Sequence, residues 1–255
     1  MKTRSRTPSE GCAVDEFHVR KISEIGRVIT GKTPSSSAPD DFGDVTPFVT
    51  PSDSFDEKYI AVTERSLSLE GVRKLRSKLL PPDAVLVTCI GTAMGKVAMN
   101  KVASITNQQI NAIVVSDDYS PHYIFYVLKN SYHQLRRAAS GSTAVPLLSK
   151  GDFNLLSVRV HKDKSIQQKV AAVLSVLDAK IDLNNRINAE LEALAKTVYD
   201  YWFVQFDFPD ANGRPYRSSG GAMVWNEALK REIPAGWESG ALSDIANITM
   251  GQSPA

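Results

Sequence analysis

The sequence is poor in the residues that build metal sites and disulfides. It has 2 cysteines and 4 histidines among 255 residues, and neither cysteine belongs to a CxxC pair. Cys12 lies in a polar N-terminal stretch and Cys89 in an apolar run. Two such cysteines fit a reducing compartment. We therefore predict a cytoplasmic protein without structural disulfides and without a metal site.

Long hydrophobic runs are also missing. The mean hydropathy is −0.20, and no segment approaches the roughly 18 apolar residues that a membrane span requires. The polar N-terminus has no apolar stretch of the kind found in signal peptides. The sequence therefore predicts no membrane contact, and residues 1–16 are predicted to form a disordered tail.

The net charge is small, but positive and negative residues are unevenly distributed along the chain. The formal net charge is +2. Residues 1–162 hold 21 Lys+Arg against 16 Asp+Glu, whereas residues 163–255 hold 9 against 12. A positive surplus can neutralise phosphates, and a negative surplus does not favour that contact. The pattern predicts a modest preference for nucleic acid in the first part and a protein partner for the second.

The motifs of DNA-modifying enzymes are absent. An adenine methyltransferase needs an N/D-P-P-Y/F motif to hold the flipped base, and the nearest string, Leu80–Asp83, lacks the aromatic residue. A glycine-rich cofactor loop is missing too. The Pro-Asp pairs at Asp40 and Asp210 have no E-x-K downstream to complete a nuclease metal site. The sequence therefore predicts a non-catalytic protein, and a free-standing DNA-binding regulator remains the alternative function.

Short apolar runs between turn signals dominate the first 160 residues. Such runs are typical of strands, and one segment, residues 121–139, has apolar residues at helical spacing. These patterns predict a mixed α/β domain with long polar surface loops. The predicted strands are Val45–Thr50, Ala84–Ile90, Lys96–Met99, Ala112–Val115 and Val158–Val160.

The pattern changes at residue 163. Residues 165–206 contain neither proline nor glycine, and their apolar residues recur at three- and four-residue spacing. Asp163 or Ser165 can cap the start of a helix. At 1.5 Å per residue this helix can reach roughly 60 Å, which no small globular core needs. We predict a long coiled-coil-type helix over residues 163–206, followed by a linker loop over 207–236 that is rich in Pro, Gly, Asn and Ser.

The end of the chain repeats its beginning. With an offset of 220 residues, the segment from Phe17 aligns with the segment from Trp237, and Ser23, Ile25, Gly31 and Pro34 recur identically. A period this long indicates duplicated domains. We therefore predict that residues 237–255 start a second domain like the one over 17–162, and that the chain holds half of a two-domain design.

In this order the motifs resemble the DNA specificity subunits of type I restriction–modification systems. The family's domains open with an aromatic residue, an L-x-D-I-like turn and G-x-[ST]-P, and each domain precedes a long helix. The chain departs from the family pattern at His161-Lys162 and at Pro81-Pro82, both in loops. The similar segments are Ile22–Ile25, Gly31–Pro34, Leu86–Lys96, Ser140–Ser142, Leu147–Val160, Gln167–Ala171, Leu177–Asp182, Asn188–Glu192, Trp202–Phe206, Asn212–Tyr216 and Ile233–Trp237.

The resemblance implies an α+β fold and a non-catalytic function. The domain over 17–162 would read one half of a bipartite target in double-stranded DNA. The helix would set the distance to the other half and dock adenine methyltransferase subunits, with restriction subunits joining the complex. S-adenosylmethionine, ATP and Mg²⁺ are then expected on those partners alone. Because the family's two helices pack antiparallel, a half-subunit is expected to form a homodimer.

Several polar residues are candidates for DNA contact, and each has a plainer alternative. Gly31–Pro34 is either a phosphate-facing loop or a connecting turn. The turn between Gly91 and Lys96 likewise either contacts DNA or only connects two strands. The cations of residues 73–78 track the DNA backbone or form a solvated face. Amides at 107–109 read adenine or satisfy loop backbone, and two small hydroxyl residues complete the set. The candidates are Lys32, Thr33, Arg73, Arg76, Lys78, Thr92, Lys96, Asn107, Gln108, Gln109, Ser142 and Thr143.

The apolar face of the long helix is the candidate partner surface. Asn184 interrupts that face, where a polar residue fixes coiled-coil register or simply contacts water. The aromatic residues at the helix end form either a docking surface or a local core. The candidate partner residues are Val173, Leu177, Asn184, Ile187, Leu191, Leu194, Val198 and Trp202.

Overall fold

The computed structural model describes residues 16–35, 37–60, 62–139 and 146–251. The chain divides into two compact units, Met1–Asp182 and Leu183–Ala255, and the boundary falls within one helix. The predicted tail over 1–16 lies outside the described residues except for Glu16.

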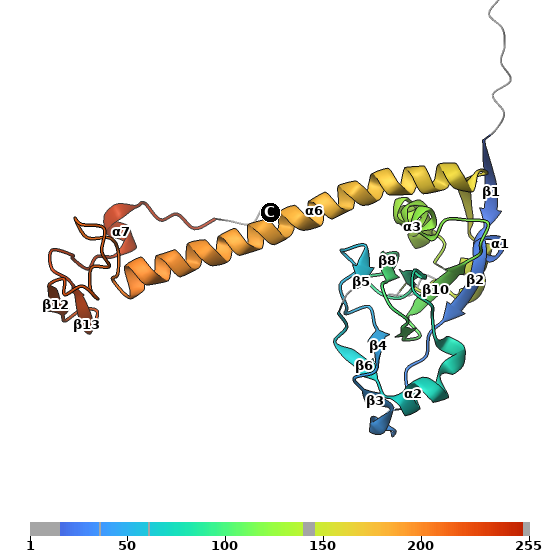
Figure 1. The fold of residues 1–255 in the computed structure, drawn as a ribbon, viewed down its shortest axis with the longest axis horizontal. Coiled ribbons are helices and arrows are strands. Elements are labelled where there is room, and N and C mark those ends of the chain that lie inside the picture. Colours follow the sequence, from blue (N-terminus) through green and yellow to red (C-terminus); the bar gives the residue numbers. More distant parts are fainter. Residues whose placement is uncertain (1–15, 36, 61, 140–145, 252–255) are drawn as a thin grey trace, which may run out of the picture. The chain divides into compact units, whose positions relative to one another are not determined.

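A five-stranded sheet forms the centre of the first unit (Figure 1). Its pairs are antiparallel except for the last, which is parallel. The three central strands are buried along most of their length because apolar residues cover both faces. In spatial order the strands are β2 (Gly26–Thr30), β10 (Ile110–Val115), β7 (Val85–Thr88), β8 (Val97–Asn100) and β5 (Tyr59–Ile60).

A smaller four-stranded sheet packs around its own core of Phe48, Leu67, Leu75 and Ile105. Ser68 caps the short helix that follows one of its strands, because its side chain accepts a hydrogen bond from Gly71 N. The elements here are β3 (Phe42–Gly43), β6 (Arg65–Leu67), β4 (Thr46–Val49), β9 (Ile105–Thr106), α2 (Leu69–Lys74) and the 3₁₀ turns Pro39–Asp41 and Arg76–Lys78.

Three short helices cover the main core: α3 (Pro121–Asn130), α4 (Tyr132–Arg137) and α5 (Lys150–Leu155). The sequence predicted one helix over 121–139, but the backbone leaves the helical conformation at Ser131. The Ser131 hydroxyl donates to Val127 O at 2.8 Å, a local bond that competes with helix continuation. Ile124, Leu128 and Leu135 are buried and Val127 is partly buried, so the predicted apolar face does point inward.

The domain closes on itself through its first and last strands. β1 (Phe17–Lys21) pairs antiparallel with β11 (Ser157–His161), with Phe17 opposite His161. Between β1 and β2 lies a single helical turn, α1 (Ile22–Ile25), whose Ile22 and Ile25 are fully buried. Lys21 N donates to the Glu24 carboxylate at 2.7 Å and so stabilises the start of this turn.

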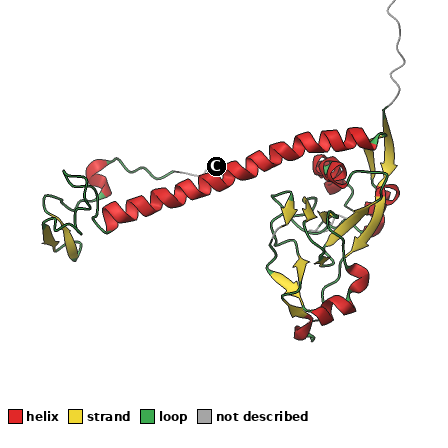
Figure 2. Ribbon diagram, in the orientation of Figure 1, coloured by secondary structure: helices red, strands yellow, loops and turns green. Residues whose placement is uncertain are grey.

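The predicted long helix is present as α6 (Lys164–Tyr199), and the chain continues in a wider π-type turn over Asp200–Val204 (Figure 2). Phe206, at φ 64°, ends the helical conformation. The prediction of an α+β fold with a mixed domain followed by a long helix is therefore confirmed.

The second unit contains more structure than the predicted loop over 207–236. Strands β12 (Met223–Asn226) and β13 (Arg231–Pro234) form an antiparallel hairpin. Further on, α7 (Leu242–Ile245) begins 220 residues after α1, which is the offset of the sequence repeat. Ala241 N donates to the Asp244 carboxylate at 2.7 Å, as Lys21 N does to Glu24. Unlike their counterparts in α1, Leu242 and Ile245 are exposed.

Candidate nucleic-acid interface and partner helix

Most candidate DNA-contact residues lie in loops at one end of the strands of the five-stranded sheet. Asn111 pairs with Thr30 and Ile110 with Thr88, so β10 begins where β2 and β7 end. Val97, the first residue of β8, pairs with Val87 at the same edge. The loops after β2, before β10 and between β7 and β8 therefore emerge together, although they are far apart in the sequence.

The loop after β2 contacts the turn before β10 directly. Lys32 N donates to Thr106 O at 2.9 Å, and Thr33 Oγ1 donates to Gln108 Oε1 at 2.6 Å. Gly31 makes this approach possible, since a Cβ there would lie 2.0 Å from Thr106 O and 2.2 Å from Asn107 O. The pair Thr33–Gln108 is exposed, so a hydroxyl and an amide are presented side by side.

A hollow of about 360 Å³ lies beside this loop and is lined by Lys32, Thr33, Pro34, Ser35, Ala38, Asp41, Lys74 and Leu75. Through Lys74 and Leu75 it adjoins the cationic segment 73–78. Arg73 and Arg76 are exposed, and Lys78 is half-buried. Lys74 bonds to the buried carboxylate of Asp41 at 2.6 Å, and this hydrogen bond raises the pKa of Lys74. Arg73 also has an acidic neighbour, Glu70, at 2.9 Å.

The turn between β7 and β8 holds Thr92 and Lys96. Gly95, at φ 91°, allows its sharp course, and Lys96 Nζ lies 3.0 Å from Asp56 Oδ1. Arg136 from α4 donates to Thr92 O at 3.2 Å and to Met94 O at 3.4 Å. Arg136 was not among the predicted site residues, because only the tertiary contact between α4 and this turn places it there.

Of the three neighbouring amides, only Gln108 has an exposed side chain. Asn107 is 7% exposed, and its side chain bonds to Gln109 N and to Gln109 Oε1, each at 3.0 Å. This arrangement matches the plainer alternative, in which the amide makes hydrogen bonds within its own loop. Ser142 and Thr143 lie outside the described residues, although Gly91 N donates to Pro146 O nearby in the chain.

Within the described part of the chain, no group of three His, Cys, Asp or Glu side chains is arranged to hold a metal ion. Cys89 is buried, and burial raises the pKa of its thiol to about 11. No helix among the described residues is both long and apolar enough to cross a membrane.

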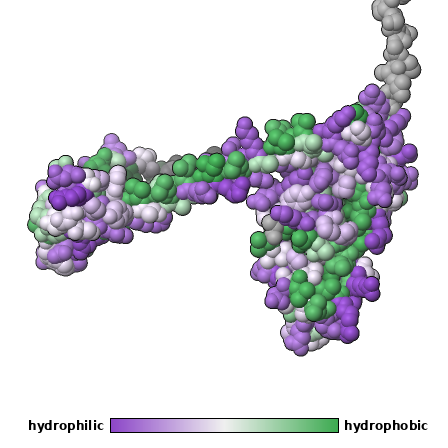
Figure 3. All heavy atoms as spheres, viewed as in Figure 1, coloured by the Kyte–Doolittle hydropathy of each residue, from purple (hydrophilic) through white to green (hydrophobic). Residues whose placement is uncertain are grey.

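The candidate partner face of α6 is exposed along its length (Figure 3). Seven of the eight candidate residues are apolar, and burying such a stripe is favourable. Near the helix end, Leu191, Leu194, Ala195, Val198, Tyr199, Trp202 and Phe203 line an open apolar groove of about 470 Å³. Side-chain exposure is 65% at Val173, 54% at Leu177, 43% at Ile187, 57% at Leu191, 58% at Leu194 and 37% at Trp202, while Asn184 is exposed and Val198 half-buried.

The aromatic residues at and after the end of the helix divide between the two predicted alternatives. Trp202 and Phe203 stay exposed. Phe206 is 4% exposed and packs edge-on against Trp237 at 5.5 Å, and Phe208 stacks on the same indole at 5.3 Å. Trp202 and Phe203 thus remain accessible for a partner, whereas Phe206 and Phe208 build a small local core.

Residues 14–193 match the family model described as "Type I restriction modification DNA specificity domain". The chain belongs to this family. The family is one of non-catalytic specificity subunits, in agreement with the prediction that the chain is not an enzyme. The MjaIX specificity subunit from Methanocaldococcus jannaschii is 29% identical over 241 residues, which cover 93% of this chain and 53% of that protein.

Further members of the specificity family resemble the chain in sequence or fold. The HindI specificity subunit from Haemophilus influenzae is 32% identical over 62% of this chain and 35% of its own length. The HsdS subunit from Thermoanaerobacter tengcongensis and an S subunit from M. genitalium share the fold, each with a TM-score of 0.52, at 18% and 16% identity. They cover 77% and 75% of this chain, and 47% and 46% of the respective structures. The chain thus aligns with about a third to a half of the length of these relatives.

Proposed function

We propose that this chain reads one half of a bipartite target in double-stranded DNA for a type I restriction–modification complex. The observation that carries the proposal is the gathering of three polar loops at one edge of the five-stranded sheet, beside the cationic segment 73–78. Lysine and arginine side chains suit phosphates, and the exposed Thr33–Gln108 pair suits base edges.

Each candidate residue then has a defined part in the interface. Lys32, Arg73, Arg76, Lys78 and Lys96 contact phosphates. Gln108 reads a base, held in position by Thr33, and Asn107 and Gln109 shape the turn that presents it. Thr92 completes the contacts from the turn between β7 and β8, and Ser142 and Thr143 are proposed DNA contacts on their residue type alone.

The exposed face of α6 is the proposed protein-binding surface. It docks adenine methyltransferase subunits, which carry S-adenosylmethionine, and restriction subunits that use ATP and Mg²⁺ join the same complex in the cytoplasm. A second copy of the chain packs against the same face, so that two domains read an inverted repeat. A helix of 36 residues is about 54 Å long, which corresponds to about 16 base pairs at 3.4 Å each.

Removing Arg73, Arg76 and Lys78 together, each by substitution with alanine, should flatten the salt dependence of DNA binding. Each lost phosphate contact lowers the slope of log K against log salt by about 0.9, so the total loss approaches about 2.7. Fluorescence anisotropy titrations at several salt concentrations measure the slope. A matched control removes Lys169, Lys180 and Arg186, three exposed cations of α6, and should leave it unchanged. A slope equal to that of the wild type in the first variant contradicts a phosphate role for the segment.

Substituting Gln108 with alanine should relax base preference at one position of the target. Thr33 occupies Gln108 Oε1, so the proposed base contact is made by Nε2. Its loss reduces discrimination by about 1 kcal/mol, while the salt slope stays the same because no charge is removed. Binding selection from a randomised DNA library, followed by sequencing, reports the preference at each position. Gln168→Ala, which removes an exposed amide of α6, is the control. An unaltered motif in Gln108→Ala assigns the base contacts to other residues.

A further inference from the structure

The first turn of α6 is fixed by a fully buried amide to the domain over residues 17–162, which we call the recognition domain. Gln167 is 0% exposed; its Nε2 donates to His161 O at 2.8 Å, and its Oε1 accepts from Ser120 N at 2.9 Å. One turn later, Ala171 is 3% exposed. These contacts define one point of attachment, about which the rest of the helix could still rotate.

A second point of attachment lies two to three turns farther along the same face. Lys58 Nζ donates to Ser175 Oγ at 2.7 Å, and Ser175 Oγ donates to Ala171 O at 2.7 Å. Tyr126 OH donates to Asp178 Oδ2 at 2.6 Å. We call Lys58, Tyr126, Ser175 and Asp178 the helix latch. Lys58 precedes β5 and Tyr126 belongs to α3, so the latch joins α6 to two separate elements of the domain.

The latch contains a cation that is almost completely removed from water. Lys58 is 8% exposed, and its ammonium lies 5.0–5.7 Å from the ring centroids of Tyr59, Phe125 and Tyr126. Burial lowers the pKa of Lys58, while the carboxylates of Asp178 and Asp83 act in the opposite direction. A buried charge is tolerated only where its partners are correctly placed. The latch is therefore specific for one position of the helix.

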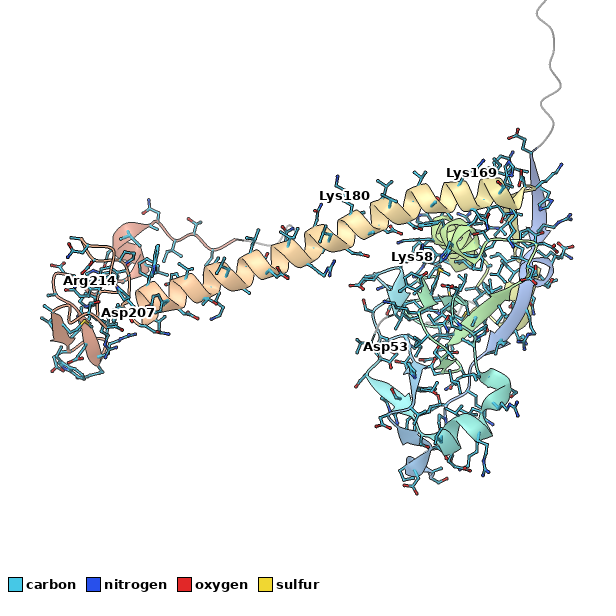
Figure 4. All side chains as sticks on the ribbon, in the orientation of Figure 1. Asp53, Lys58, Lys169, Lys180, Asp207 and Arg214 are labelled. Carbon is cyan, nitrogen blue, oxygen red and sulfur yellow. The ribbon has the colours of Figure 1, made fainter. Side chains whose placement is uncertain are left out.

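The cations of α6 itself contrast with Lys58. Lys169 and Lys180 are exposed and extend from the helix into solvent, whereas Lys58 lies among side chains of the domain (Figure 4). Ser175 and Asp178 follow Gln167 by 8 and 11 residues, which is about 12–17 Å along the axis. Two attachments at this separation determine the direction of a rigid rod, which a single attachment does not.

We propose that the helix latch fixes the direction in which α6 leaves the recognition domain, and that it thereby determines the number of unspecified base pairs accepted between the two halves of the target. This inference rests on the proposed function. A rotation of about 10° at Gln167 would move Asp182, the last residue of the first unit, about 22 Å away along the helix, by about 4 Å. That displacement is on the scale of one base pair. The latch residues are positioning residues, since none of them needs to touch DNA.

The spacer length is measured directly by sequencing methylated DNA. The full chain is co-expressed with an adenine methyltransferase subunit of its system, and single-molecule sequencing of the host genome reports each methylated motif and its spacer. With the wild type we expect one spacer length. With Tyr126→Phe/Ser175→Ala, and with Lys58→Met, we expect the same half-site bases but at least about a tenfold larger share of motifs with other spacers, the factor that corresponds to a charge-assisted hydrogen bond. Lys169→Met is the matched control and should resemble the wild type.

The helix direction itself is measured by electron–electron double resonance between spin labels at Lys101→Cys and Lys180→Cys, both exposed positions of the first unit. Cys12 is replaced by serine, and the buried Cys89 reacts slowly because burial raises the pKa of its thiol to about 11. A narrow distance distribution is expected in the wild type and a broader one in the latch variants.

The outcomes separate the two proposals. An identical spacer and an identical distance distribution in both latch variants overturn the latch. A wild-type chain that directs no bipartite methylation overturns the proposed function, whatever the distance measurements show. Circular dichroism and thermal unfolding confirm that each variant is folded, and the conservative Tyr126→Phe/Ser175→Ala variant keeps the test valid if Lys58→Met does not fold.

Discussion

Substituting Leu191 with aspartate should abolish the association of α6 with a second helix. Leu191 lines the apolar groove near the helix end and is 57% exposed in the isolated chain. A carboxylate buried in such an interface remains unpaired, and in a two-fold dimer it occurs twice. We expect affinity to fall by at least about 100-fold, since truncating a central contact alone costs about 2 kcal/mol or more per site.

Sedimentation analysis at micromolar concentration, with and without the methyltransferase subunit, measures this loss. Ala193→Asp is a close control, because it introduces the same charge on the same helix but at a residue that does not line the groove. A wild-type chain that remains strictly monomeric without partners contradicts the homodimer. An unchanged association of Leu191→Asp contradicts the assignment of the groove.

Substituting Gly31 with alanine should destabilise the recognition domain strongly. The added Cβ would lie 2.0 Å from Thr106 O and 2.2 Å from Asn107 O. Thr106 pairs with Val49 in the sheet, and Asn107 N donates to Val49 O at 2.9 Å, so both backbone oxygens are held in place. Such overpacking costs about 3 kcal/mol, which lowers the melting temperature of a domain of this size by about 6–12 °C.

Thermal unfolding followed by circular dichroism measures this effect. Gly151→Ala provides the comparison: Gly151 lies in α5, and the nearest atom to its added Cβ is 3.6 Å away, an ordinary contact. That variant should be as stable as the wild type or slightly more so. If Gly31→Ala unfolds at the wild-type temperature, the close approach of the two loops is not rigid.

Local sequence patterns predicted the elements that local patterns control. The long helix follows from the absence of proline and glycine over 165–206 and from regular apolar spacing, and the buried strands β7 and β10 follow from their apolar runs. The second unit was harder to predict. Its Gly, Asn and Ser residues indicate turns, but these residue types do not show which segments pair, as Val224 does with Ile233 in the hairpin.

The candidate interface depends on contacts that no local pattern contains. β2 was not predicted, so no sequence pattern placed Thr33 beside Gln108, 75 residues away. Asn107 and Gln108 are neighbours with similar side chains, yet only the tertiary structure shows that one is buried and the other exposed. Lys58 is equally instructive, because a lysine in a polar stretch is normally on the surface.

The pairing of β1 with β11 places the start and the end of the recognition domain next to each other, with Phe17 opposite His161. A fold whose two ends adjoin can be removed or inserted as a unit, since the host chain needs to accommodate only one short gap. Residues 17–161 therefore form a cassette. Recombination at its borders would exchange what is read on DNA while leaving the helix that follows, and everything bound to that helix, in place.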